Sequence, residues 1–393
     1  MTFENLKEQE NKYVMNTYGR FPIALDHGEN SVLWDVEGKR YIDMTSGIGV
    51  CSVGYNNEKL ISAMCEQAHK LMHVSNLFTT EPMIKTAKTL VESTGMAKVF
   101  FSNSGAESNE GAIKLARKYS FDKYGQGRSK IVTLVNSFHG RTITTLNATG
   151  QEKFHQYFFP FTEGFDYAQA NNIEDLKSKI DDTTCAVMME LIQGEGGVLP
   201  LDKQFVKQVE ALCKEKDLLL IIDEVQTGIG RTGSLFCFQQ YDIMPDVVTM
   251  AKGLGGGVPI GAVMANQKCC DVLGVGMHAT TFGGTPTVCA AANAVLDIVN
   301  NPEFLQDVKK KGEYIVNGIN AINSDKVHGV RGMGLMLGII VDADKRAELV
   351  NKCIENGLLV ITAGTNAIRL LPPLTISYEE IDEALKIFKT VLA

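Results

Sequence analysis

Hydrophobic positions along most of the chain follow two alternating patterns. Short, almost wholly apolar runs such as "KIVTLV", "CAVMM" and "LLLII" are separated by longer segments, such as "DKQFVKQVEALCKEK", whose apolar residues recur every three or four positions. The short runs predict buried strands, and the longer segments predict amphipathic helices. Strands that alternate with helices are typical of a mostly parallel sheet with helices on both faces. The pattern therefore predicts an α/β fold.

Both ends of the chain depart from this alternation. Near the N-terminus, "SVLWDVEGKRYIDM" predicts a hairpin that turns at Gly38. Toward the C-terminus we expect an α+β arrangement: a helix over 303–322, a strand near "GLMLGIIVD", a helix over 345–356 and a closing helix from Ser377. The 393 residues are enough for two lobes. We expect an N-terminal segment, 1–60, that joins a small C-terminal domain, 291–393, and a large domain over 61–290.

Composition narrows the class of protein. The formal net charge of −8 argues against binding to nucleic acid or to an anionic membrane, since both favour a basic surface. The nine cysteines are an odd number in scattered positions, which is typical of reduced thiols in the cytoplasm. The N-terminal stretch is charged rather than apolar, and no apolar run is long enough to span a bilayer. We therefore expect a soluble cytoplasmic protein.

Polar residues follow several of the predicted strands directly, at the edge where parallel sheets bind ligands. Five such segments stand out: Ser102–Ala106, Ser137–Arg141, Glu190–Gly197, Asp223–Gln226 and Lys252. In "SNSGAES", the free N–H groups of Ser104, Gly105 and Ala106 at a helix start could bind an anion, although a plain helix cap explains the stretch equally well.

Two charged residues end strands that are otherwise apolar. Asp223, followed by Glu224, closes the most apolar strand, so it must pair with a cation or a strong donor; a structural ion pair and a ligand contact are equally open. Lys252, in "TMAKGLGGGVPIGA", ends another buried strand. Burial lowers the pKa of a lysine and frees its amine for imine formation, while the simpler alternative is an ion pair with Asp223.

Taken together, the strand ends supply the groups that a pyridoxal phosphate (PLP) site needs. That cofactor requires a lysine amine, a carboxylate beside its pyridine nitrogen, a helix start for its phosphate, an aromatic face over its ring and a donor near its phenolate oxygen. The matching residues are Lys252, Asp223, Ser104–Ala106, Phe138 and Gln226.

Two other motifs are weaker. "GIGRTG", Gly228–Gly233, matches the dinucleotide-binding pattern, but it does not follow its strand at once and does not open a clear helix, so we interpret it as a turn and disfavour an NAD- or nucleotide-binding protein. His69 and His73 are expected on one helix face, where they could form a metal pair. Since no third ligand is in view, we expect no metal site.

At this point the chain resembles the class III (ω-amino-acid) PLP-dependent aminotransferases nearly end to end, and within them the acetylornithine aminotransferases most. The motifs that carry the resemblance are "NSGAESNEGAIKLARKY", "SFHGRT", "IQGEGGV", "IIDEVQTGIGRTG", "AKGLGGGVPIGA", "TTFGG" and "AIRLLPPLT". The resemblance implies the type I PLP-dependent aminotransferase fold and a homodimer whose partner subunit completes each site.

The resemblance also implies roles for individual residues. Lys252 would bond to the cofactor and carry the proton, Asp223 would face the pyridinium, Val225 would pack on the ring face opposite Phe138, and Glu224 would belong to the same cofactor-binding segment. Thr281 would reach the neighbouring subunit's phosphate, with Thr280 beside the substrate. Arg141 would bind the α-carboxylate of the amino donor and Arg369 a carboxylate of 2-oxoglutarate, with Glu195 pairing with Arg369 as a gate.

The expected reaction moves the distal amine of N2-acetyl-L-ornithine to 2-oxoglutarate, usually in arginine biosynthesis. A sister ω-aminotransferase acting on N-succinylornithine, N-succinyl-diaminopimelate or ornithine remains open, because the sequence does not fix the acyl group. A non-catalytic relative is disfavoured by the intact pair of Lys252 and Asp223. Leu191 and Thr285 depart from the family's usual proline and asparagine. Neither departure removes a catalytic group.

Overall fold

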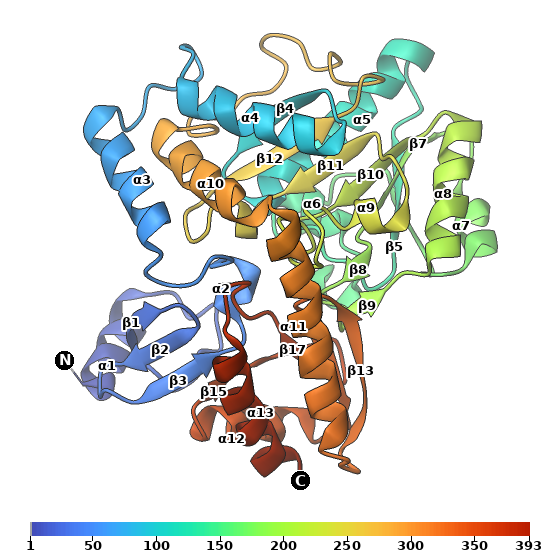
Figure 1. Ribbon diagram of the computed structural model, residues 1–393. Helices are drawn as coiled ribbons and strands as arrows, with labels where there is room; N and C mark the ends of the chain where they lie inside the picture. Colours follow the sequence, from blue (N-terminus) through green and yellow to red (C-terminus); the bar gives the residue numbers. More distant parts are fainter. Residues whose placement is uncertain (1) are drawn as a thin grey trace.

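The computed structural model describes residues 2–393, and its centre is a seven-stranded sheet (Figure 1). In spatial order the strands are β4 (Lys98–Ser102), β12 (Gly261–Ala265), β11 (Val247–Met250), β10 (Leu219–Asp223), β7 (Thr184–Met189), β5 (Lys130–Leu134) and β6 (Phe165–Ala168). Strand β12 runs antiparallel to both of its neighbours, and the other strands share one direction. The predicted mostly parallel sheet is confirmed.

Helices cover both faces of this sheet (Figure 1). They are α3 (Glu58–Lys70), α4 (Glu81–Thr94), α5 (Gly105–Tyr124), α6 (Ile143–Ala148), α7 (Ile173–Lys179), α8 (Lys203–Lys216), α9 (Phe238–Tyr241) and α10 (Pro286–Val299). Along β10, Leu219 and Ile221 pack in one core cluster with α5, while Leu220 and Ile222 pack in the other. Both faces of the strand are therefore buried, which explains why its sequence is continuously apolar.

Two smaller sheets lie below the large one (Figure 1). The first joins β1 (Leu25–Glu29), β2 (Val32–Asp35) and β3 (Arg40–Asp43) to β15 (Leu358–Leu359). The second has the order β13 (Val327–Met333), β14 (Met336–Val341), β17 (Ala367–Leu370) and β16 (Ile361–Ala363). The pairing of β3 with β15 connects the N-terminal segment to the C-terminal part of the chain.

The remaining elements are short pairs and flanking helices. The terminal helices are α1 (Phe3–Tyr13), α11 (Pro302–Ala321), α12 (Arg346–Glu355) and α13 (Tyr378–Leu392), the last capped by Ser377 as predicted. The short segment α2 (Ser46–Gly49) and the strand pair β8 (Ile192–Gln193) with β9 (Leu199–Pro200) complete the fold. The predicted hairpin is confirmed: β2 pairs with β3 around Gly38, whose φ is +82°.

One expectation needs correction, and one strand was missed. Helix α3 ends at Lys70, so His73 lies beyond it and does not share a helix face with His69. Instead, the Nδ1 atom of His73 lies 2.8 Å from the Oγ1 atom of Thr285. Among residues 2–393, no group of three or more potential metal-ligating side chains gathers at one place. The sequence pattern also gave no separate prediction for β12, the antiparallel strand after the glycine run.

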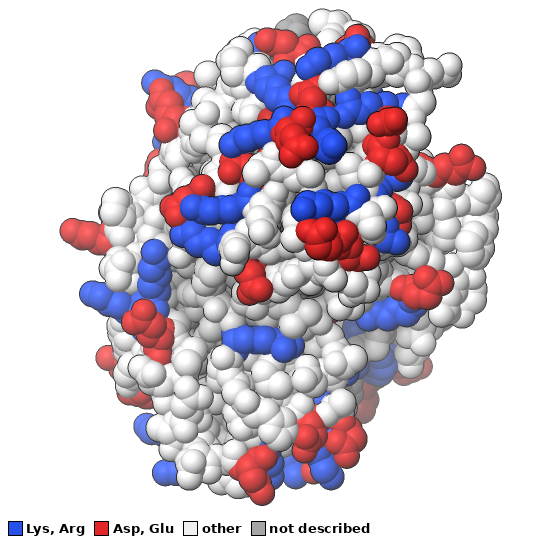
Figure 2. Space-filling model, turned by 90° about the vertical axis from the view of Figure 1, so that its right-hand side faces the viewer, with Lys and Arg blue, Asp and Glu red and all other residues white. Residues whose placement is uncertain are grey.

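The described residues contain no helix that is both long and apolar enough to cross a membrane. On the face shown in Figure 2, basic and acidic side chains are interspersed rather than separated into areas of one sign.

Candidate active site

A cavity of about 610 Å³ lies at the carboxyl ends of the central strands. Its walls come from the segments that follow β4, β5, β7, β10 and β11. They include Gly105, Phe138, Arg141, Asp223, Gln226 and Lys252. The structure therefore brings together residues that are far apart in the sequence, at the sheet edge where a ligand was expected.

Lys252 stands two residues beyond the end of β11, at the start of a short 3₁₀ turn, Lys252–Leu254, and its backbone is left-handed (φ +37°). A non-glycine residue in this region costs on the order of 1–3 kcal/mol, so its surroundings must hold it there. The Oγ atom of Ser52 donates to the carbonyl oxygen of Gly253 at 2.9 Å and helps to fix the turn. Burial lowers the pKa of Lys252, Glu195 opposes that change, and Arg369 adds to it. The lysine is thus disposed to present a neutral amine.

Asp223 is 3% exposed and is held by three donors at the end of β10. Its Oδ2 atom accepts from the Nδ2 atom of Asn109 and from the Nδ1 atom of His139, each at 2.8 Å, and its Oδ1 atom accepts from the N–H of Val225 at 3.0 Å. Because a carboxylate can only accept, Nδ1 of His139 must carry a proton. This network fixes the carboxylate at the wall of the cavity.

The start of α5 forms an adjoining part of the cavity wall. Ser104 caps the helix by accepting from the N–H of Glu107 at 3.2 Å, and the N–H groups of the first turn have no partner within the helix. Val225 packs against Gly105 so closely that an added Cβ would lie 2.7 Å from its Cγ1 atom. A glycine is therefore required here, and the helix start stays open to an anionic ligand.

A buried glutamate joins the loop after β5 to the loop after β7. The carboxylate of Glu190 accepts from the N–H of Phe138 at 2.9 Å and from the N–H of Gly194 at 3.3 Å. Burial raises the pKa of Glu190 to about 7.

Arg141 lies on the loop after β5 and is exposed. Its guanidinium lies 4.2 Å from the ring centre of Phe154 and 5.5 Å from that of Phe138. Arg141 is therefore available to an anionic group of a ligand.

Arg369, on β17, forms an ion pair beside the cavity. Its Nη1 atom donates to the Oε1 atom of Glu195 at 2.6 Å and to the Oε1 atom of Gln226 at 3.1 Å. The Arg369 side chain is 3% exposed and that of Glu195 is 31% exposed. Burial works to raise the pKa of Glu195, but Arg369, together with Lys252 and Lys153, outweighs burial, so the pKa lies below the ordinary value. Through Gln226 this pair connects to the cavity wall.

Other predicted site residues lie away from the cavity wall. Glu224 faces inward, where its carboxylate accepts from Thr227 at 2.6 Å and from the N–H of Phe238 at 2.7 Å. The Oγ1 atom of Thr280 accepts from the Nδ2 atom of Asn103 at 2.8 Å, and Thr281 is exposed. Both carboxyl oxygens of Glu224 accept hydrogen bonds within its own loop, so the cofactor-binding role expected for this residue stays a prediction.

Two roles at the site were not identified from the sequence. Asn109 stands four positions after Gly105, so the helical repeat places it on the same face of α5, and this spacing was the available signal. Glu190 was visible as the end of an apolar strand, but nothing in the pattern showed that it joins two loops. The "GIGRTG" stretch forms turns, as predicted, and the next helix, α9, begins only at Phe238.

Comparison with known proteins agrees with this geometry. The family Aminotransferase class-III matches residues 13–392. The chain is 48% identical over 395 residues to an acetylornithine aminotransferase of Haemophilus ducreyi, covering all of both chains. It is 43% identical to a succinylornithine transaminase of Citrobacter koseri, covering 99% of this chain and 97% of the relative.

A solved structure is also similar. An ornithine aminotransferase of Toxoplasma gondii, described with partial occupancy of PLP at its active site, superposes with a TM-score of 0.95 at 30% identity, covering 100% of this chain and 94% of that one. The match of the family to nearly the whole chain, and of the fold to a solved relative, settles the classification. The chain belongs to the class III aminotransferases.

Proposed function

We propose that this enzyme transfers the distal amine of N2-acetyl-L-ornithine to 2-oxoglutarate and releases N-acetyl-L-glutamate 5-semialdehyde and L-glutamate. The observation that carries the proposal is that Lys252 and Asp223 line one cavity with the open start of α5. The identity of 48% to an acetylornithine aminotransferase supports the choice of donor.

The residues of the cavity fit PLP. The helix start at Ser104–Ala106 suits its phosphate, Asp223 its pyridine nitrogen, Phe138 and Val225 the two faces of its ring, and Gln226 its phenolate oxygen. The requirement for glycine at position 105 leaves backbone N–H groups accessible there. When bound, PLP supplies an electron sink that stabilises negative charge at the substrate carbon.

The side chains of the protein then have defined tasks. The Nζ atom of Lys252, with its lowered pKa, is suited to bond to the cofactor and, once released, to accept and return a proton beside the reacting carbon. Asn109 and His139 fix the carboxylate of Asp223 so that its charge cannot turn away. The positions of these groups before the reaction reduce the reorganisation that the reaction requires.

Carboxylate recognition is divided between two arginines. Arg141 binds the α-carboxylate of acetylornithine, which places the distal amine toward Lys252. Glu195 neutralises Arg369 during that half of the reaction, and it releases Arg369 to a carboxylate of 2-oxoglutarate in the other half. The ion pair between Arg369 and Glu195 at 2.6 Å supports this gate, because it is the contact expected of the closed form. A buried arginine without a partner would be costly, which explains why a partner is needed in each half.

We further propose a homodimer. Met72, Leu77, Phe78 and Phe282 are apolar but 61–86% exposed, and such a group marks an association surface. Their two segments adjoin, because the Nδ2 atom of Asn76 donates to the carbonyl oxygen of Gly283 at 2.7 Å. Thr281 lies within this surface, which supports its contact with the phosphate bound to the neighbouring subunit.

The broader setting is part of the same proposal. Nine free cysteines, most of them buried, support a reducing compartment such as the cytoplasm. The proposed donor and product belong to arginine biosynthesis. The domain division 1–60, 61–290 and 291–393 is supported by the separate sheets and by the pairing of β3 with β15.

One alternative donor has a specific observation in its favour. The 43% identity to a succinylornithine transaminase keeps N-succinylornithine as a second candidate, with N-succinyl-diaminopimelate and ornithine as further sister substrates.

A visible absorption spectrum tests the proposal. The purified protein should carry a PLP band that disappears when N-acetyl-L-ornithine is added without a keto acid and returns with 2-oxoglutarate. Parallel additions of N-succinyl-L-ornithine and ornithine rank the donors. A band that persists with acetylornithine but disappears with another donor would reject the acetyl assignment and keep the aminotransferase.

A further inference from the structure

The "GIGRTG" turn contains a buried arginine that the reaction does not use. Arg231 is 2% exposed, at the centre of Gly228–Gly233. Within the described part of the chain, its guanidinium donates to the carbonyl oxygens of Leu335 at 3.0 Å and Pro372 at 2.5 Å, and to the Oγ atom of Ser46 at 3.4 Å. A buried charge that is bound mainly by backbone carbonyls is unusual, so its partners indicate its purpose.

The carbonyl groups of Leu335 and Pro372 lie at the same end of two neighbouring strands, β14 and β17, in the C-terminal sheet. Leu335 immediately precedes β14, and Pro372 follows the end of β17. These strands are antiparallel neighbours, and Arg369 on β17 pairs in register with Gly338 on β14. Arg231 therefore binds the two strand ends nearest to Arg369, one from each strand, and resists any separation or sliding of these ends.

The backbone of the turn strengthens the same contact. The carbonyl oxygen of Arg231 accepts from the N–H of Leu335 at 3.0 Å. In the hairpin between β13 and β14, Gly334 (φ +54°) rests on the turn so closely that an added Cβ would lie 2.6 Å from the carbonyl carbon of Thr232. The glycine at this position lets the two backbones touch.

A third partner extends the contact toward the cavity. Ser46 donates to the carbonyl oxygen of Leu371 at 2.6 Å, and the N–H of Leu371 donates to the carbonyl oxygen of Met44 at 2.7 Å. The same N-terminal segment continues to Val50, which lines the cavity. The residues that follow Arg369 are therefore held from two sides, by Arg231 and by the segment around Ser46.

We propose that Arg231 is a positioning residue for Arg369. It fixes these ends of β14 and β17 against the turn that follows β10, and so sets the distance between Arg369 and the cavity in which the keto acid is bound. The inference rests on the proposed role of Arg369 in binding a carboxylate of 2-oxoglutarate. Arg141 lies on a different loop, after β5, so recognition of the amino donor does not depend on Arg231.

The test compares Arg231→Met with a matched control, Lys311→Met. Lys311 is also a buried cation, and its Nζ atom donates to the carbonyl oxygen of Leu374 at 3.3 Å, two residues beyond Pro372. For each variant, KM is measured for 2-oxoglutarate and for N-acetyl-L-ornithine, and 2-oxoglutarate binding is measured by calorimetry. Arg231→Met should raise KM and Kd for 2-oxoglutarate about tenfold and leave the donor KM within about twofold.

Arg231→Lys is the conservative variant, and it carries the test if the methionine variant does not fold. One ammonium can bond to part of the carbonyl set, so the rise in KM for 2-oxoglutarate should shrink to about threefold. Lys311→Met should lower the unfolding temperature and leave the ratio of the two KM values unchanged. If the Arg231 variants change both KM values equally, or change only stability, the residue is structural and the proposal is wrong.

An Arg369→Met variant separates the two proposals. If it leaves 2-oxoglutarate binding intact, the assigned role of Arg369 fails, whatever the Arg231 variants do. If it weakens binding while Arg231→Met and Arg231→Lys do not, only the positioning role fails.

Discussion

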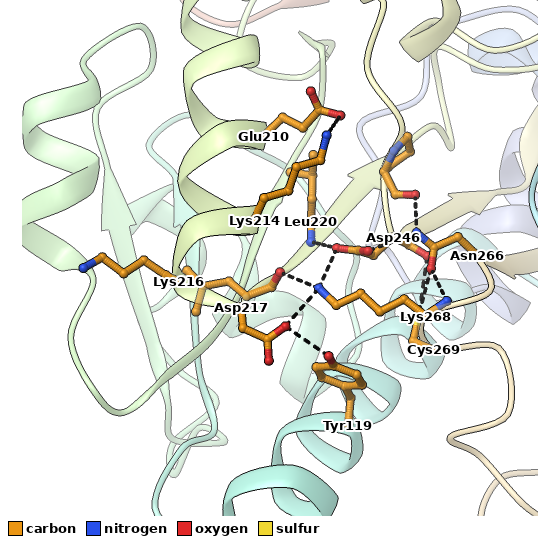
Figure 3. A network of polar contacts seen from close by, with 12 residues as sticks. Tyr119, Glu210, Lys214, Lys216, Asp217, Leu220, Asp246, Asn266, Lys268 and Cys269 are labelled. Atoms are coloured by element: carbon orange, nitrogen blue, oxygen red, sulfur yellow. Dashed lines mark hydrogen bonds and ion pairs between the residues drawn. The ribbon is translucent and has the colours of Figure 1, made fainter.

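Strands β10 and β11 have charged side chains at both of their ends, and these charges are paired differently at the two ends. At the carboxyl ends lie Asp223 and Lys252, in the wall of the cavity. At the other ends lie Asp217 and Asp246, joined by Lys268, which follows the antiparallel strand β12 (Figure 3). The sheet is the same and the residue types are the same, so the difference lies in how the charges are paired.

The two lysines show this difference most directly. The Nζ atom of Lys268 lies 3.4 Å from Asp217 and 3.6 Å from Asp246, and donates to the carbonyl oxygen of Leu218 at 3.3 Å. Burial works to lower its pKa, but Asp246 and other neighbours outweigh burial and raise it. For Lys252 the same competition ends the other way, and the pKa falls. Paired charge gives a stable ammonium, and incompletely compensated burial gives a reactive amine.

Asp246 illustrates what complete pairing means. One carboxylate oxygen accepts from the N–H of Leu220 at 2.9 Å and the other from Asn266 at 3.0 Å, as Figure 3 shows. These contacts anchor the start of β10 and the end of β12. At the cavity, Asp223 is held just as firmly by Asn109 and His139, but it also faces space for a ligand. The first end of the sheet is built for stability, and the second holds groups ready for chemistry.

The largest expected effect is the difference between replacing Lys252 and replacing Lys268 by alanine. Lys252→Ala should lower the transamination rate by about 10³-fold, because no other amine is placed to carry the proton. Its unfolding temperature should stay the same or rise, since burial disfavours the ammonium there. Lys268→Ala should reduce the free energy of unfolding by about 1–3 kcal/mol and leave the rate within about twofold. Stopped-flow rates and thermal denaturation of both variants provide the check, and a rate loss in Lys268→Ala would contradict the comparison.

A second pair of substitutions compares the aspartates. Asp223→Asn should lower the rate by about 10²-fold, because the fixed negative charge at the cavity is lost while its shape is kept. Asp246→Asn should leave the rate unchanged and cost about 1–3 kcal/mol in unfolding free energy, because its new amide nitrogen would face the amide of Asn266. Rates and urea denaturation distinguish the two. Equal effects on rate would mean that the charge of Asp223 has no special role.

The sequence predicted the cavity end of these strands far better than the other end. Lys252 and Asp223 are conspicuous because a charge that ends an apolar strand needs a reason, and the rule for parallel sheets places such ends together. The network of Lys268 was not predicted, because its members lie in loops whose meeting depends on the antiparallel course of β12. That strand follows a glycine-rich turn, and no local pattern shows which way the chain leaves it.

Within the site, the residues that follow a strand directly were predictable from the sequence. The direction of a side chain and its contacts with distant strands were not. Gly105 and Phe138 were predicted by their position after strands. The resemblance placed Glu224 in the cofactor-binding segment with Asp223, yet successive residues at a strand end point in opposite directions, and its carboxyl group contacts Thr227 and Phe238. The second role of Gln226, as an acceptor for Arg369, depends on β17, which is more than a hundred residues away in the sequence.

A smaller effect is expected for the gate. Glu195→Gln should lower the ratio of distal-amine to α-amine transamination by about tenfold, because Arg369 would no longer be neutralised and would favour donors with a second carboxylate. Rates with N-acetyl-L-ornithine and with L-glutamate give this ratio. The low pKa of Glu195 means that the wild-type pair should persist in mildly acidic buffer. An unchanged ratio would reject the gate.

The last expected effect is on stability alone, with no change in the transamination rate, and it compares the two ends of the sheet through their dependence on pH. Burial raises the pKa of Glu224 from its ordinary 4.5 to about 7. Its contribution to stability is therefore fully present below about pH 4.5 and is lost as the pH rises through 7. The pKa of Asp217 is lowered: burial opposes the change, but Lys123, Tyr124 and Lys268 outweigh it. Its contribution is present above pH 3.8 and is lost as the pH falls.

Denaturation curves between pH 5 and 8 should therefore separate the wild type from Glu224→Gln. The wild type should lose up to ~3 kcal/mol more than the variant over this range, because only the wild type must ionise this buried carboxyl group. Asp217→Asn should leave the change in unfolding free energy between pH 5 and 8 as it is in the wild type. Below pH 4 the unfolding free energy of this variant should depend less on pH. Parallel curves for the wild type and Glu224→Gln would mean that the loop around Thr227 and Phe238 already stabilises the carboxylate. The carboxyl group that follows Asp223 would then be paired as completely as Asp217 and Asp246 are at the other end of the sheet.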